Sequence, residues 1–249
     1  MRPNHFVFNG SFLLRFLSAT IVFLLVANIA TQVAKLEFGH RNLLGFVHTF
    51  SLDGEGAAGA YFSSLQLFIA ACLLTVIAKV ERNSAGYGRY WVVLAIGFYL
   101  LSLDEAVALH ERLVDPMRAL LGKENLGLLY YGWIVPGAIG AAAVGLYFLP
   151  FLFRLPIATR RQFVLAASLF LGGAVGVEAL EGRYFEQHGL DDFGFSLYIF
   201  IEEGMEMTGI LVFIRGLLGY LRGICPTVTI VVDPAAQAEG RAGPLGPPD

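Results

Sequence analysis

Six long runs of apolar residues constrain this chain more than any other feature of its sequence. A run of roughly 18 or more apolar residues can cross the hydrocarbon core of a bilayer as a helix. The six runs cover about Phe12–Ala34, Ala58–Val80, Tyr90–Leu113, Leu128–Phe151, Phe163–Gly182 and Ser196–Leu221. Only 15% of all residues are charged, against about 25% in soluble domains. The sequence therefore predicts an all-α integral membrane bundle of about six transmembrane helices.

The two ends of the chain differ from this apolar body. Arg2 precedes the first run, but that run is too long for a secretory signal, and Ala27-Asn28-Ile29-Ala30 is a poor cleavage sequence. The last residues mix Pro, Gly and Ala with few large apolar side chains, a composition typical of disorder. We therefore expect a transmembrane domain over residues 1–222 and a disordered cytoplasmic tail over residues 223–249. With no basic patch, we expect no nucleic acid partner.

The distribution of Lys and Arg predicts the orientation in the membrane. One side holds 11 of the 17 basic residues: Arg2, Arg15, Lys79, Arg82, Arg89, Arg154, Arg160, Arg161, Arg215, Arg222 and Arg241. The other side holds the remaining 6: Lys35, Arg41, Arg112, Arg118, Lys123 and Arg183. Cytoplasmic loops carry the excess of Lys and Arg. This count predicts a multi-pass inner (plasma) membrane protein with both termini in the cytoplasm.

Acidic side chains gather in the spans near the outer side. An ionisable residue within a span costs about 2.5–3.5 kcal/mol on insertion scales and usually marks function. The third, fifth and sixth spans carry these residues at their outer ends: Asp104, Glu105, His110 and Glu111; Glu178 and Glu181; Glu202, Glu203 and Glu206. The first outer loop adds His40, His48, Asp53 and Glu55. We expect these clusters to converge in the outer half of the membrane.

Helical spacing suggests how the carboxylates are directed. Residues three, four or seven apart share a helix face, so Glu178 and Glu181 form one pair and Glu202 and Glu206 another. Asp104 and Glu111 are expected on one face, about 10 Å apart along the axis. Arginines in the outer loops are too few to neutralise all these acids. Unpaired carboxylates in the membrane would have to be protonated or hold a cation.

Two nearby groups have simpler interpretations. Tyr130, Tyr131 and Trp133 open the fourth span, where an aromatic interface belt would explain them without any chemistry. His188, Asp191 and Asp192 are expected to be exposed residues of the last outer loop.

The ligand types resemble those of carboxylate-bridged dimetal bundles, in which inward helices supply Glu and Glu-x-x-His pairs. No Glu-x-x-His occurs in these clusters, and a carboxylate-rich set also suits other hard cations. We expect a divalent metal, with iron or manganese favoured over zinc or calcium. The expected ligands are Asp104, His110, Glu111, Glu178, Glu181, Glu202 and Glu206, and the expected orienting or proton-carrying residues are Glu105 and Glu203.

The same motifs resemble a family of uncharacterised bacterial six-span inner-membrane proteins. The likeness rests on Leu103-Asp104-Glu105 with His110-Glu111, on Glu178-x-x-Glu181, and on Glu202-Glu203-x-x-Glu206-Met207-x-Gly209. Leu52-Asp53-Gly54-Glu55, followed by Phe62-Ser63-Ser64, is similar to that family's first outer loop and second span. The likeness covers residues 45 to 222 and implies a bacterial inner membrane and a shared acidic motif set, but no reaction.

Three functions fit these features. The first is a metal-dependent membrane enzyme whose ion or ion pair lies near the periplasmic face and acts on a lipid-like substrate. The second is a cation- or proton-coupled transporter that uses the same acids. The third is a non-catalytic sensor or assembly subunit stabilised by metal. A site open to one side only favours an enzyme or a sensor. The sequence does not indicate the oligomeric state.

Overall fold

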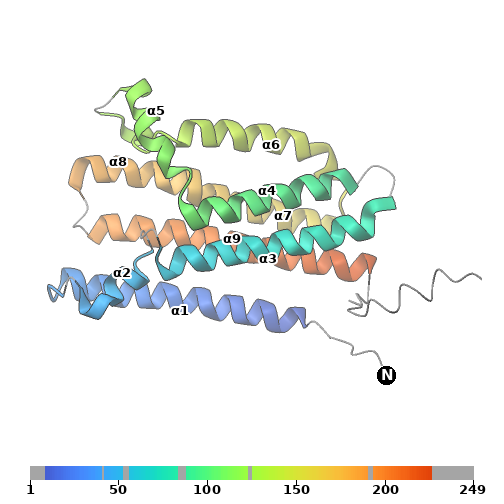
Figure 1. The fold of residues 1–249 in the computed structure, drawn as a ribbon, viewed down its shortest axis with the longest axis horizontal. Coiled ribbons are helices and arrows are strands. Elements are labelled where there is room, and N and C mark those ends of the chain that lie inside the picture. The colour runs from blue at the N-terminus through green and yellow to red at the C-terminus, as the bar shows by residue number, and fades with distance from the viewer. Residues whose placement is uncertain are drawn as a thin grey trace, which may run out of the picture.

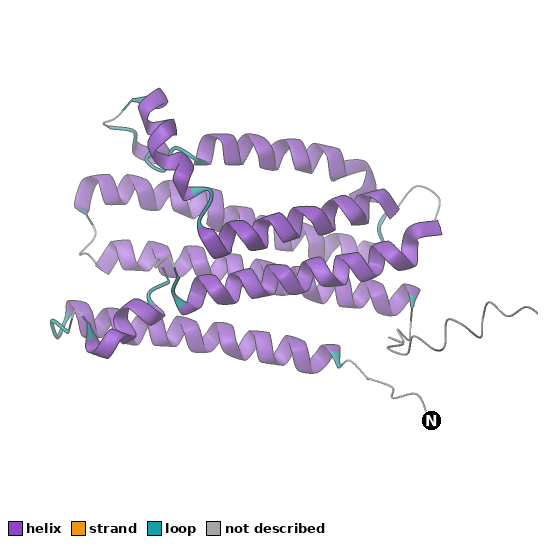
Figure 2. Cartoon of the chain, viewed as in Figure 1, coloured by secondary structure: helices purple, strands orange, loops and turns teal. Residues whose placement is uncertain are grey.

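The computed structural model describes residues 9–40, 42–52, 56–83, 88–122, 125–189 and 193–225. Within these residues the chain forms helices and no strand (Figure 2). The predicted tail lies mostly outside the described residues, as do Asp53, Glu55, Asp191 and Asp192. The α-helices are α1 (Gly10–Leu36), α2 (Phe46–Phe50), α3 (Ala58–Val80), α4 (Gly88–Val107), α5 (Val114–Leu121), α6 (Ile134–Arg154), α7 (Ile157–Leu171), α8 (Glu178–His188) and α9 (Phe193–Ile224).

In the described part of the chain, five helical segments are long and apolar enough to cross a membrane. They are α1, α3, α4, α6 and the continuous segment from residue 157 to residue 188. The last comprises α7, a π-helix (Gly172–Val177) and α8. The prediction of an all-α membrane bundle is therefore confirmed. α9 has 32 residues but is not one of the five, and it carries Glu202, Glu203 and Glu206 in its first half.

The long helices lie side by side along one direction (Figure 1). α9 lies inside the bundle and packs against α7, α3, α1 and α8. α1 begins and α9 ends at one end of the bundle, which we call the terminal end. The short helices α2 and α5, the carboxyl end of α8 and the start of α9 lie at the opposite end, which we call the acidic end. The acids of α4, α8 and α9 belong to this second end.

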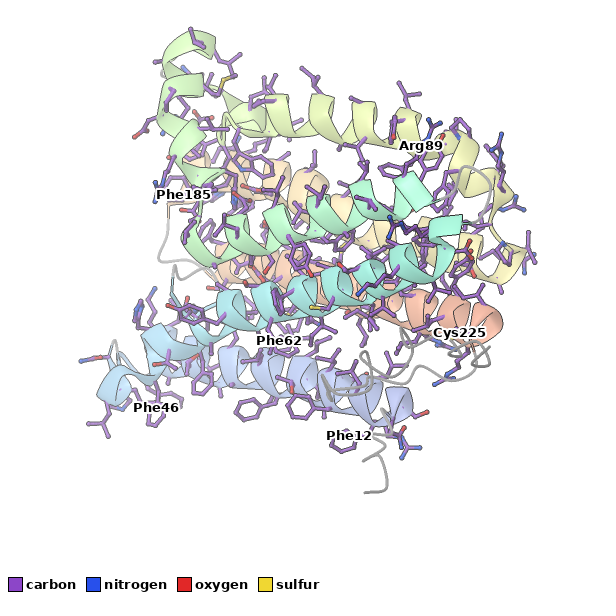
Figure 3. All side chains as sticks on the ribbon, turned by 45° about the vertical axis from the view of Figure 1, so that its right-hand side comes forward. Phe12, Phe46, Phe62, Arg89, Phe185 and Cys225 are labelled. Atoms are coloured by element: carbon purple, nitrogen blue, oxygen red, sulfur yellow. The ribbon has the colours of Figure 1, made fainter. Side chains whose placement is uncertain are left out.

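Large apolar side chains cover the outside of the bundle. Phe12 on α1 is 68% exposed and Leu146 on α6 is 71% exposed, and Figure 3 shows Phe12 at the edge of the molecule. A soluble protein rarely leaves such surfaces open to water. On a membrane helix these side chains face the lipid tails, which fits the span assignment.

Local signals explain where helices begin and end. The side chain of Asn9 accepts hydrogen bonds from the backbone N–H groups of Ser11 and Phe12 and so caps the start of α1. Pro156 has no N–H to continue α6, which ends at Arg154, and it stands directly before α7. The predicted span Ala58–Val80 coincides with α3.

Ser64 of α3 and Ser102 of α4 fasten the two helices to each other within the membrane. The Ser64 hydroxyl donates to the Ser102 carbonyl at 2.7 Å, and the Ser102 hydroxyl donates to the Ser64 carbonyl at 2.9 Å. The helices approach closely because both residues are small. This contact lies two residues before Asp104 and so helps to fix the end of α4.

Aromatic side chains pack the terminal half of the bundle. The Trp91 ring, fully buried, lies 4.9 Å from the Phe151 ring and 4.8 Å from the Tyr220 ring. The Phe163 and Phe213 rings are 4.6 Å apart. These rings come from α4, α6, α7 and α9. Because cores pack without voids wide enough for water, they close this half of the bundle between those helices.

Candidate functional site

α4 ends earlier than the sequence predicts, and this changes the geometry of the first acidic cluster. The helix stops at Val107, and Ala108 takes a left-handed backbone conformation with φ of 48°. Such a residue commonly terminates a helix. The chain turns back, and the His110 backbone N–H donates to Asp104 Oδ1 at 2.9 Å. The prediction that Asp104 and Glu111 share one helix face is therefore wrong, because no helix continues between them.

The turn places the His110 ring against the Asp104 carboxylate. Asp104 Oδ2 and His110 Nδ1 are 2.8 Å apart, and the two side chains are 27% and 29% exposed. The ring also packs on the Trp133 ring, with centroids 4.8 Å apart. Burial acts to lower the pKa of His110, but the hydrogen bond and negative charge of Asp104 outweigh it, so this pKa is raised. With Nδ1 held by Asp104, Nε2 is the nitrogen left to bind a proton or a metal.

The glutamates of α8 have aromatic partners. Trp133 Nε1–H donates to Glu178 Oε1 at 2.6 Å, and the Tyr131 hydroxyl donates to Glu181 Oε1 at 2.9 Å. Gly137 makes room for the indole, since a Cβ there would lie 2.5 Å from a Trp133 ring carbon. Tyr131 and Trp133 therefore do more than an interface belt requires, because their polar atoms donate to the acids.

Both α8 glutamates lie deeper along their helix than expected. The predicted fifth span ended at residue 182, whereas α8 continues to His188. His188 is the last residue of α8, and its ring stacks on Tyr184 at 4.2 Å. It is thus part of the helix and not of the loop. Glu181 is only 4% exposed, so its carboxylate needs partners within the protein.

α9 brings a third set of acids against α8. The carboxyl groups of Glu181 and Glu202 lie within hydrogen-bonding reach of each other. The second oxygen of Glu202, Oε2, is buried without a hydrogen-bond partner among the described residues. A hydrogen bond between two carboxyl groups needs a proton on one of them, and a cation can take that proton's place. Glu202 is the tenth residue of α9, so the positive end of the helix does not explain it.

The acids of the three helices lie within electrostatic range of one another. Glu178 interacts with His110, Glu111 and Glu181. Glu206 interacts with Glu203, Glu105 and Glu178. We call the set Asp104, Glu105, His110, Glu178, Glu181, Glu202 and Glu206 the acidic layer. The side chain of Glu111 is exposed and borders this layer.

The π-helix positions α8 against α9. A Cβ on Gly173 would lie 2.8 Å from Glu206 Cγ and 2.9 Å from the Glu202 carbonyl oxygen. Only glycine allows this approach. π-Helical turns are rare and occur frequently at functional sites. The π-helix ends directly before Glu178, so it sets the direction in which Glu178 and Glu181 project.

The acidic layer is built from pairs. Asp104 is hydrogen-bonded to His110, Trp133 donates to Glu178, and the carboxyl group of Glu181 lies next to that of Glu202. Among the described residues, no group of three His, Cys, Asp or Glu side chains is placed to hold one metal ion. A shared ion would therefore require at least one of these pairs to separate. His40 and His48 of the first outer loop are exposed and have no contact with the layer that the structure records.

Sequence reasoning missed Tyr131, Trp133 and Gly173. The signal for the glycine was present in Gly172-Gly173-Ala174-Val175-Gly176, three glycines within five residues directly before Glu178. Glycine inside a helix lowers its stability and usually has a packing reason. Tyr131 and Trp133 gave no comparable signal, because aromatic residues of an interface belt occupy the same position at the start of a span.

Comparison with known proteins gives a family and no activity. No curated protein and no solved structure matches the chain. One family model, described as a domain of unknown function (DUF8692), matches residues 14–221. The match includes α3 to α8, all of the acidic layer and most of α1 and α9. The chain belongs to the DUF8692 family.

Proposed function

We propose that the protein is a metal-dependent membrane enzyme whose site is the acidic layer. The observation that carries this proposal is the Asp104–His110 pair, which lies within electrostatic range of Glu178 and Glu111. Histidines that bind metals almost always donate their other ring N–H to a carboxylate or carbonyl, which fixes the tautomer and orientation. Asp104 fits that orienting role better than the ligand role that the sequence suggested.

The ligands proposed for a first ion are His110 Nε2, Glu178 and Glu111. A second ion would use the acids that α8 and α9 bring together, Glu181, Glu202 and Glu206. Glu105 and Glu203 would orient ligands or carry protons. Because the described side chains form pairs, binding would separate Glu181 from Glu202 and Glu178 from Trp133.

A carboxylate-rich set with one histidine favours iron or manganese, while zinc and calcium remain alternatives. When bound, a redox metal would supply oxygen chemistry, and a redox-inert one would polarise water or a carbonyl group. The residues of the chain would hold and orient the ion and move protons. Exposed apolar surfaces surround the bundle, so the substrate class that fits is lipid-like and membrane-soluble.

An enzyme fits the closed terminal half better than a transporter does. The rings of Trp91, Phe151 and Phe213 fill the interior on the side away from the acids. A transport path would have to pass between them. With α9 as the sixth span and both termini cytoplasmic, the acidic layer would open only toward the periplasm of a bacterial inner membrane.

Metal analysis of the protein, purified in mild detergent without chelator, tests the proposal. We expect one or two equivalents of a transition metal in the wild type and a loss of at least half of it in Glu178→Gln. Glu37→Gln is the matched control, because Glu37 follows α1 and is exposed. Absence of stoichiometric metal from protein reconstituted with iron, manganese and zinc in turn would refute the metalloenzyme.

A proton-coupled transporter is the second candidate, and the close approach of the Glu181 and Glu202 carboxyl groups favours it. Two buried carboxyl groups in contact can share a proton and exchange it without metal. Proton flux into proteoliposomes that is lost in Glu202→Gln, together with absence of bound metal, would support this function. Metal that raises stability without any turnover would instead support the sensor or assembly subunit.

A further inference from the structure

Two polar side chains are buried in the contact between α3 and α9, outside the acidic layer. Gln66 is 0% exposed and Ser63 is 2% exposed. The side-chain oxygens Gln66 Oε1 and Ser63 Oγ have no hydrogen-bond partner among the described residues. Such groups are rare in folded proteins, and each calls for an explanation such as a bound water or ion. Three residues apart, they share one face of α3.

The contacts of α9 show what this face of α3 meets. The Gln66 side-chain amide donates a long hydrogen bond, 3.5 Å, to the Met207 carbonyl. Gly204 faces Leu25 of α1, and Glu206 faces Gly173 of the π-helix. Glu203 lies four residues before Met207 and so on the same side of α9. Glu203 thus belongs to the side of α9 that meets α3 at Met207.

α3 and α9 both begin at the acidic end and run in the same direction (Figure 1). Ser63 lies three residues before Gln66 on α3, and Glu203 lies four residues before Met207 on α9. Ser63 and Glu203 therefore both lie about one turn nearer the acidic end than the Gln66–Met207 contact. The two unsatisfied oxygens and one carboxylate thus border the same stretch of the helix contact.

We propose that Ser63, Gln66 and Glu203 bind a sodium-sized monovalent cation between α3 and α9. All the side-chain atoms offered are oxygens, the ligands that hard cations prefer. One carboxylate balances one positive charge, which matters because charges interact strongly in a low-dielectric interior. Intramembrane acids commonly mark ion sites. Ser63 and Gln66 have no part in the proposed metal site, and Glu203, which would orient ligands or carry protons there, is the one residue that the two sites share.

Thermal unfolding of the full chain in detergent tests the site, with EDTA present to remove divalent ions. Melting temperatures are measured against NaCl, with choline chloride keeping the ionic strength constant. We expect sodium to raise the melting temperature, since a ligand that binds only the folded state stabilises it. Ser63→Ala and Gln66→Leu should each raise the half-saturating sodium concentration at least tenfold. Equilibrium dialysis with radioactive sodium provides a direct measurement of the same change.

Ser18→Ala is the matched control, because the Ser18 hydroxyl is exposed and donates to the Leu14 carbonyl of its own helix, and its sodium response should equal the wild type's. If Gln66→Leu does not fold, Ser63→Ala decides, since it removes one oxygen and adds no bulk. Equal melting temperatures in sodium and choline would overturn the proposal. A sodium response that Ser63→Ala leaves unchanged would overturn it as well, and would indicate that water binds the side-chain oxygens of Ser63 and Gln66.

Discussion

Replacing Gly173 with alanine should separate α8 from α9 at the acidic layer. The new Cβ would lie 2.8 Å from Glu206 Cγ and 2.9 Å from the Glu202 carbonyl oxygen. Carbon atoms in ordinary contact are about 3.5–4.0 Å apart, so the helices would have to move apart by roughly 0.5 Å or more. The carbonyl belongs to the backbone of α9 and cannot rotate away as a side chain can.

Gly176 of the same π-helix provides the reference substitution for the free energy of unfolding. A Cβ on Gly176 would meet nothing within 4 Å. Alanine is favoured over glycine in a helix by about 1 kcal/mol, and this gain applies to both positions. Overpacking a tight contact costs about 1–3 kcal/mol and applies to Gly173 alone. The free energy of unfolding of Gly173→Ala should therefore lie about 1–3 kcal/mol below that of Gly176→Ala.

Reversible unfolding in an SDS titration, followed by far-ultraviolet circular dichroism, measures this difference. The comparison between two alanine variants removes the common helix preference, so only the contact with α9 remains. Free energies that agree to within about 0.5 kcal/mol, the range of an ordinary surface substitution, would refute the close packing at Gly173. Gly173→Ala should also weaken the interaction of Glu206 with Glu178, which the metal analysis above would register as lower occupancy.

Three further changes test individual contacts. Trp133→Phe keeps a ring but removes the donor to Glu178, and should lower the free energy of unfolding by about 1–3 kcal/mol, the usual cost of leaving a buried polar group without its partner. An unchanged SDS titration would contradict that bond. Asp104→Asn in chelator-treated protein should lower the pKa of His110 from its raised value, because burial is then opposed only by the charges of Glu178 and Glu111. NMR titration of the imidazole measures this change, and an unchanged pKa would contradict the pairing. Ser64→Ala should lower the free energy of unfolding by about 0.6 kcal/mol, the mean for hydrogen bonds between membrane helices, and a loss above that of a core truncation would indicate a different role.

The sequence was sufficient to predict the membrane bundle, because hydrophobic length is set by the bilayer and not by tertiary contacts. The span Ala58–Val80 matches α3 residue for residue. The predicted third span ran past Val107 because Leu109 and Leu113 continue the apolar pattern. Ala108 in a left-handed conformation ends the helix, and alanine gives no sequence signal for that.

Partners across helices were beyond sequence reasoning. Glu178 and Glu181 were identified as unusual, but their donors Trp133 and Tyr131 lie more than 40 residues away in the chain. Nothing in helical periodicity relates such distant positions. The pairing of Asp104 with His110 was missed for the opposite reason, since both were assigned to a single helix whose real end lies between them.

The π-helix before Glu178 also has an evolutionary consequence. A π-turn corresponds to one residue inserted into an α-helix, and each residue turns an α-helix by about 100°. Deleting one residue between Gly172 and Val177 would restore regular helix and leave α7 in place. The wide turn with its i→i+5 hydrogen bonds takes up the extra residue, so the same deletion would leave Glu178 and Glu181 on nearly the same side of the helix. The π-helix thus lets the chain carry one extra residue where it contacts Glu202 and Glu206, while both carboxylates keep their direction.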